Sequence, residues 1–323
     1  MANWSAACGH CTKREVVHCC GVCTFDRERC NSLYPRQDKP KAVADLLMRS
    51  GFAAFTPCEL FQRIRGRTMW FMGDSQTWAF YYAAECFLRE FAPSLRRTPA
   101  VAPEENQQLK IVSHISPPLC LNLARNTRVC GVRVDYASDV QKKVLPRLMK
   151  LVPNFKEDIV VLNTGLHYPE YDHPETPSPR YVQELTALAE WRQLHADFLP
   201  RIVWMDTGPQ HFFTHEGTFP GHGKRPFKCR PLDAWYKGDP VVGAGTRRAM
   251  AVAPIVSRLA DAHLQIYNAT VPLWDSHLPG ECSHWCQPSA YQLWLYLLND
   301  VLRDSELGNA VRMPGSPAGD SRR

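Results

Sequence analysis

The stretch Thr68-Met69-Trp70-Phe71-Met72-Gly73-Asp74-Ser75 decides the fold of this chain. It is a short apolar run that ends in three turn-forming residues, which is typical of a buried strand leading into a turn. The residues that follow, from Gln76 to Phe91, are rich in aromatic side chains and predict a helix. A buried strand followed by a turn and a helix is the first part of a strand–helix–strand unit.

The same alternation continues along the chain. Further strands are predicted at Leu109–Ser113, Asp158–Asn163, Arg201–Asp206 and Leu264–Tyr267. Further helices are predicted at Asp139–Leu151, Arg180–Phe198, Thr246–Ala260 and Ser289–Leu302, and a long surface loop at Phe212–Pro240. Strands that alternate with helices favour a parallel sheet covered on both faces. We therefore expect one α/β domain with three layers, α/β/α, and a parallel central sheet.

Composition and length set the limits of this domain. The 323 residues allow one large domain or two small ones, at about 100–200 residues per domain. We expect a Cys-rich N-terminal extension at 1–57, the α/β domain at 58–305 and a disordered Gly/Pro/Ser-rich tail at 306–323. The 38 Lys and Arg against 32 Asp and Glu give a net charge of +6 with no basic stripe. No nucleic-acid partner is expected, although an anionic polymer fits the charge.

Gly73-Asp74-Ser75 is the first candidate for chemistry, because it lies where a parallel strand ends and a helix begins. A serine there presents its hydroxyl where backbone N–H groups can stabilise an oxyanion. The alternative is that Asp74 or Ser75 only caps the helix.

A second candidate lies between Trp274 and Pro288, just before the last predicted helix. Glu281 and His284 are three residues apart there, on a loop with two cysteines, and can supply a base and the acid that orients it. Ordinary loop histidines, His277 and His284, are the alternative. A third candidate is Asn163, whose amide could donate to an oxyanion or belong to a plain Asn-Thr-Gly turn.

Taken in order, these motifs resemble the trichome birefringence-like and PC-esterase family, a branch of the SGNH hydrolase superfamily. The resemblance covers about three quarters of the chain, from Cys58 to Leu302. Its motifs are Cys58-Glu59-Leu60-Phe61, Arg65-Gly66-Arg67, Gly73-Asp74-Ser75, Asn163-Thr164-Gly165, Trp204–Phe212 and Cys282-Ser283-His284-Trp285-Cys286. The last of these is the most specific.

The resemblance implies a Golgi or other secretory enzyme that moves or removes O-acetyl groups on cell-wall polysaccharides. It implies a Ser–His–acid triad with no metal and no cofactor, apart from an acetyl donor if the enzyme is a transferase. Ser75 corresponds to the nucleophile and His284 to the base. Glu281 stands where the family has Asp, and Asp275 is the alternative acid. The implied oxyanion donors are the Ser75 N–H, Asn163 and Gly131.

Two stretches depart from the family pattern and leave acceptor binding open. Gln76-Thr77-Trp78-Ala79-Phe80 follows the serine where the family has Asn-Gln-type polar residues, and Leu166-His167-Tyr168 follows Asn163-Thr164-Gly165. The residues expected to line a substrate groove are Asp74, Gln76, Trp78, Tyr168, His211 and Trp285, with His215 nearby. Three functions stay open: an O-acetyltransferase, an O-acetylesterase, and a non-catalytic polysaccharide-binding protein that keeps the fold.

Thirteen cysteines favour an oxidising compartment or a metal site. Cys8, Cys11, Cys20 and Cys23 form two paired-thiol motifs that could be disulfides or, alternatively, hold Zn²⁺. The sequons at Asn3 and Asn268 agree with the secretory route. The family resemblance implies that Cys58 and Cys86 pair with N-terminal cysteines, and Cys229 with Cys282 or Cys286. Contact with a membrane is expected only through an N-terminal anchor that is not present in this chain.

Overall fold

A mixed seven-stranded sheet forms the centre of the computed structural model, which describes residues 55–89, 97–168, 178–278, 280–285, 290–305 and 307–308. The strands are β1 (Thr68–Gly73), β2 (Arg97–Pro99), β3 (Leu119–Asn122), β4 (Arg128–Arg133), β5 (Ile159–Leu162), β6 (Arg201–Met205) and β7 (Ala262–Leu264). They lie in the order β2-β3-β4-β1-β5-β6-β7. The five strands from β4 to β7 are parallel, whereas β2 and β3 are antiparallel at one edge.

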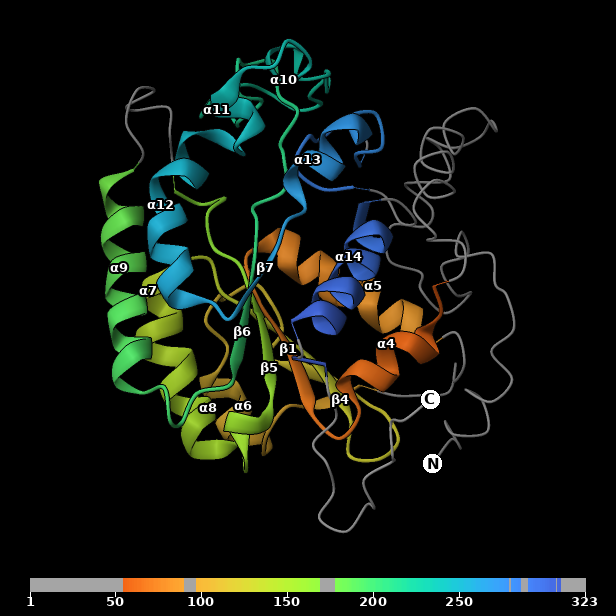
Figure 1. The fold of residues 1–323 in the computed structure, drawn as a ribbon, viewed down its shortest axis with the longest axis vertical. Coiled ribbons are helices and arrows are strands. Elements are labelled where there is room, and N and C mark those ends of the chain that lie inside the picture. The colour runs from red at the N-terminus through yellow and green to blue at the C-terminus, as the bar shows by residue number, and fades with distance from the viewer. Residues whose placement is uncertain are drawn as a thin grey trace, which may run out of the picture.

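Helices cover both faces of this sheet (Figure 1). One face carries α4 (Pro57–Ile64), α5 (Ser75–Arg89) and α14 (Ala290–Asp304). The other carries α7 (Ala137–Asp139), the π-helix η2 (Val140–Val144), α8 (Leu145–Leu151), α9 (Pro179–Leu194) and α12 (Thr246–Leu259). The shorter elements are α6 (Pro103–Gln108), η3 (Phe155–Glu157), α10 (Asp233–Tyr236), α11 (Pro240–Gly243), α13 (Tyr267–Thr270) and η4 (Val271–Leu273). The expected three-layer α/β/α architecture is confirmed.

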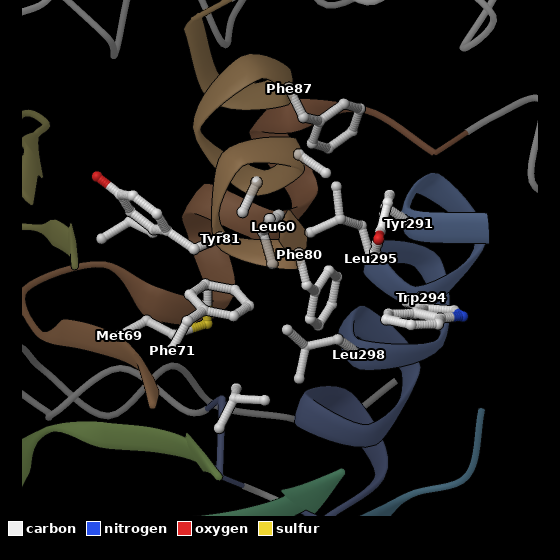
Figure 2. Close-up of a cluster of buried hydrophobic side chains, with 14 of the residues drawn as sticks. Leu60, Met69, Phe71, Phe80, Tyr81, Phe87, Tyr291, Trp294, Leu295 and Leu298 are labelled. Carbon is white, nitrogen blue, oxygen red and sulfur yellow. The ribbon is translucent and has the colours of Figure 1, made fainter. Parts of the chain in front are cut away.

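Strand β1 divides the hydrophobic core into two clusters because successive side chains point to opposite faces. Met69 and Phe71 pack against α5 and α14, as Figure 2 shows. Trp70 and Met72 pack into the cluster on the α9 and α12 side. All six residues of β1 are buried, so this strand has the continuous apolar character that a doubly covered parallel strand requires.

Most predicted elements are confirmed, and two strands are wrong. Leu109–Ser113 is not a strand, because Leu109 is the C-cap of α6 and the chain then turns. Leu264–Tyr267 is displaced, since β7 ends at Leu264 and α13 begins at Tyr267. The sequence interpretation also missed α4, β2, β3 and β4. Leu307, in the segment expected to be a tail, is buried in the core.

Two disulfides lie within the described residues. Cys120–Cys130 joins β3 to β4 directly across the sheet, and Cys229–Cys282 joins the long loop to the His284 segment. The second pairing confirms one of the two alternatives that the resemblance implied. Cys58 and Cys86 are both disulfide-bonded, but their pairing with N-terminal cysteines lies outside the described residues, as do Cys8, Cys11, Cys20 and Cys23. Among the helices described, none is long and apolar enough to cross a membrane.

Candidate active site

Ser75 begins α5 at the carboxyl end of β1, between β4 and β5. Gly73 is required there, because a Cβ at this position would lie 2.4 Å from the backbone oxygen of Asn163. Asp74 is the helix cap, since its Oδ1 accepts a 3.0 Å hydrogen bond from the Gln76 N–H. Its Oδ2 accepts from the Leu166 N–H and ties the turn to the end of β5. Asp74 therefore caps α5, and the half-buried hydroxyl of Ser75 is not needed for capping.

His284 is oriented by Glu281 and not by Asp275. The Glu281 Oε2 atom lies 2.8 Å from His284 Nδ1, whereas the side chain of Asp275 accepts from the Ser276 hydroxyl. Burial alone would raise the Glu281 pKa, but hydrogen bonds from His284 and from two backbone N–H groups lower it. The carboxylate is thus ionised at neutral pH and holds a hydrogen on Nδ1. The other ring nitrogen, Nε2, is buried and has no hydrogen-bond partner in the described structure.

Gln76 joins the serine turn to the histidine loop. Its Nε2 donates to the Ser283 backbone oxygen at 3.0 Å, and its Oε1 accepts from the Gly208 N–H at 2.8 Å. The neighbour of Ser75 is therefore bonded directly to the neighbour of His284, across 207 residues of sequence. Among the described residues no hydrogen bond joins Ser75 to His284 itself, and such contacts are often longer in an unliganded site.

A pair of buried histidines, His211 and His277, contacts the backbone of the His284 loop. His211 Nδ1 lies 2.7 Å from His277 Nε2, and His277 Nδ1 lies 2.9 Å from the backbone oxygen of His284. At the other end, His211 Nε2 lies 3.0 Å from the Val271 oxygen. His277 also stacks on Trp285. Sequence reasoning missed this support, since no local pattern links residues 66 positions apart.

The charge of the histidine pair depends on whether its hydrogen bonds or its burial has the larger effect. Three contacts need three N–H groups, whereas two neutral imidazoles carry two, so a third proton would complete the chain of hydrogen bonds. A hydrogen bond contributes about 1 kcal/mol, whereas burying an ion costs several. Burial therefore wins: it lowers the pKa of His211 to about 4 and holds that of His277 well below its usual value. The pair is neutral at pH 7.

Two of the three expected oxyanion donors are wrong in this arrangement. Asn163 uses both amide hydrogens inside the protein, on the Met205 oxygen and the Thr207 hydroxyl. Gly131 lies within β4, two residues before its end, and faces Tyr81 and Trp78. Its role is to leave room for these two rings. The Ser75 N–H at the start of α5 stays a prediction.

The six residues expected to line a substrate groove, Asp74, Gln76, Trp78, Tyr168, His211 and Trp285, have buried side chains. Tyr168 donates to Glu184 and accepts from the Ala137 N–H. Trp78 packs on Tyr81, and Trp285 on Trp294. Their roles are structural, so the expectation that they face a glycan is wrong. The mistake arose because aromatic content alone does not separate core from surface. His215, by contrast, is exposed and lies 3.4 Å from Asp239.

No protein-family model and no curated protein sequence matches this chain. Among solved structures, a protein described as a GDSL-like lipase from Parabacteroides merdae has 12% identity and a TM-score of 0.40, over 74% of this chain and 96% of its own. An acetylxylan esterase from Geobacillus stearothermophilus has 14% identity and a TM-score of 0.39, over 77% of this chain and 97% of its own. With TM-scores this low, the two similarities decide nothing about activity, which has to be argued from the site.

Proposed function

We propose that this protein is an acyl-transferring enzyme with a Ser75–His284–Glu281 triad, and that its substrates are O-acetylated polysaccharides. The observation that carries the proposal is the 2.8 Å contact between Glu281 and His284 Nδ1, which leaves Nε2 unpartnered on a loop bonded to the neighbour of Ser75. A histidine with an acid on one nitrogen and no hydrogen-bond partner on the second is arranged to accept a proton.

The reaction proceeds in two steps. Ser75 Oγ attacks the acetyl carbonyl carbon while its proton passes to His284 Nε2, and Glu281 stabilises the resulting imidazolium. The proton then goes to the leaving oxygen, which departs and leaves an acetyl ester on Ser75. In the second step an acceptor hydroxyl gives its proton to His284 Nε2 while its oxygen attacks the acetyl carbonyl carbon. The ester bond to Ser75 then breaks, the acetyl group stays on the acceptor, and Ser75 Oγ takes the proton back from His284. A sugar hydroxyl as acceptor gives transfer, and water gives hydrolysis.

The resemblance to the trichome birefringence-like family supports transfer to a polysaccharide, with hydrolysis as the alternative. The two disulfides support a secretory compartment, for which the Golgi lumen is the family's location. The departure from the family's Asp to Glu281 no longer favours a protein that only binds polysaccharide, because this carboxylate reaches His284.

The test is the intact mass of the oxidised protein after brief incubation with p-nitrophenyl acetate, beside Ser75→Ala and His284→Ala. We expect one acetyl adduct that maps to Ser75 in the wild type and none in either variant. A folded wild type with neither adduct nor ester turnover would contradict the triad. Adding acetylated xylo-oligosaccharide and unacetylated acceptor then separates transfer from release of free acetate.

A further inference from the structure

The loop disulfide-bonded to the candidate site has a net charge that is large for its length. Residues 222–237 contain five cations and one acid, a net charge of +4 against +6 for the whole chain. The cations are Lys224, Arg225, Lys228, Arg230 and Lys237, here called the basic surface, and all five are exposed. Among the described residues none of the five makes an ion pair. This one segment therefore exposes five cations that have no paired acid among the described residues.

The basic surface lies next to the His284 loop. Cys229, between Lys228 and Arg230, is bonded to Cys282, with 5.4 Å between their Cα atoms. His284 is the second residue after Cys282, a span of at most about 7 Å. Backbone hydrogen bonds make the connection firm: the Phe227 N–H donates to the Gly280 oxygen and the Arg230 N–H to the His211 oxygen. A ligand held by these cations would therefore extend toward the candidate triad.

A hollow of about 570 Å³ opens in this surface, between the segment 212–215 and α10. Arg230 and Lys237 line it together with Phe213 and the carboxylate of Asp233. The Phe213 side chain is 77% exposed, and the Arg230 guanidinium lies 4.0 Å from the centre of its ring. An aromatic face beside a guanidinium suits a sugar ring that carries a carboxylate, since the ring can stack while the acid pairs with arginine.

We propose that the basic surface binds a polysaccharide whose sugars carry carboxylate groups, and so presents its acyl groups to the site. Presentation of the acyl group rests on the proposed function, whereas binding to the surface does not. A neutral polysaccharide would leave the five cations without counter-charges, and like charges so close together repel one another. A carboxylated chain neutralises them along its length.

The test measures binding of polygalacturonate to the oxidised protein by calorimetry at low and at high salt. Fully methyl-esterified polygalacturonate has the same backbone without charge and is the matched ligand. The test variant is Lys228→Glu with Lys237→Glu. The matched control is Lys142→Glu with Lys150→Glu, which makes the same change in net charge at exposed positions of η2 and α8. Thermal unfolding checks that each variant is folded.

We expect the wild type and the control to bind the charged polymer, more weakly at high salt, and the test variant to lose about tenfold or more in affinity. Equal loss in both variants, or equal binding of the esterified polymer, would overturn the proposal. Equally tight binding of phosphatidylserine vesicles or single-stranded DNA would also overturn it, in favour of a general anion surface. Ester turnover is read in the same sample: binding without turnover contradicts the triad alone, and turnover without binding contradicts the basic surface alone.

Discussion

The loop around Glu281 accommodates the one methylene group by which a glutamate is longer than the aspartate expected at this position. Its Oε1 accepts from the backbone N–H groups of Ser283 and His284, at 2.7 and 2.8 Å, and this leaves Oε2 for the imidazole. The longer side chain thus folds back over its own loop. A shorter aspartate could not reach both the two backbone N–H groups and the imidazole, so the glutamate suits this loop better.

The variant Glu281→Gln should therefore separate geometry from charge. The new side chain would keep an oxygen for the two backbone N–H groups, but its amide would donate to Nδ1 and force the hydrogen of His284 onto Nε2. That tautomer cannot accept the serine proton, so turnover of p-nitrophenyl acetate should fall by about 10⁴-fold. Asp275→Asn is the matched control and should stay close to the wild type. An equal loss of turnover in both variants would contradict this assignment and would support Asp275 as an acid of the triad.

The buried histidine pair predicts how folding stability depends on pH. The pKa of His211 is about 4 in the folded protein against 6.5 when exposed, so the unfolded chain takes up the proton first as the pH falls. The contribution of His211 to the free energy of unfolding is therefore complete above pH 6.5. It declines by about 3 kcal/mol as the pH falls from 6.5 to 4. His211→Gln should flatten this decline in urea unfolding measured from about pH 7 to about pH 5.

The matched control for this experiment is His114→Gln, at an exposed histidine. This variant should lose as much free energy of unfolding at acid pH as the wild type does. An acid decline as steep in His211→Gln as in the wild type would mean that the pair keeps a proton when buried, as the count of hydrogen bonds alone would suggest.

At the scale of elements, the packing of α5 on β4 depends on the absence of a side chain at Gly131. A Cβ there would lie 2.6 Å from the ring of Tyr81 and 2.9 Å from that of Trp78. Gly131→Ala should therefore destabilise the fold by about 1–3 kcal/mol, measured by urea unfolding. Gly243→Ala is the control, because a Cβ there meets nothing within 4 Å. If Gly131→Ala left the free energy of unfolding unchanged, α5 could shift without a loss of stability.

The same glycine explains why β4 could not be predicted from the sequence. Strands β1 and β5 are continuous apolar runs buried on both faces, and such runs are visible in a linear sequence. Strand β4 has arginines at both ends and a glycine in the middle, which weakens its apolar pattern. Its place beside β1 depends on the parallel pairing of the two strands, in which Gly131 lies opposite Phe71, 60 residues earlier in the sequence.

The candidate site was predictable to the extent that its residues lie close together in the sequence. Glu281 and His284 are on one loop, and Ser75 follows a recognisable strand end. Gln76, His211 and His277 support the site through contacts across 66 to 207 residues. Such contacts depend on the order of the strands in the sheet, which the sequence pattern does not specify.

At the scale of the whole molecule, the two disulfides that lie within the described residues have different roles. Cys120–Cys130 closes a loop of 10 residues inside the sheet, whereas Cys229–Cys282 closes 53 residues and fixes the loop that carries His284. Loop-closure entropy gives about 3 and about 4 kcal/mol of stabilisation, respectively. The two bonds are therefore similar in stability but differ in their distance from the candidate triad.

Replacing each pair with serines should reveal this difference. Cys229→Ser with Cys282→Ser should reduce ester turnover by about 10²-fold even where the protein is fully folded, because a small displacement of His284 misaligns it with Ser75. Cys120→Ser with Cys130→Ser should lower the midpoint of urea unfolding and keep the turnover of each folded molecule. Turnover is measured at a temperature where circular dichroism shows both variants folded. If turnover in both followed only the folded fraction, the Cys229–Cys282 bond would have no part in positioning the base.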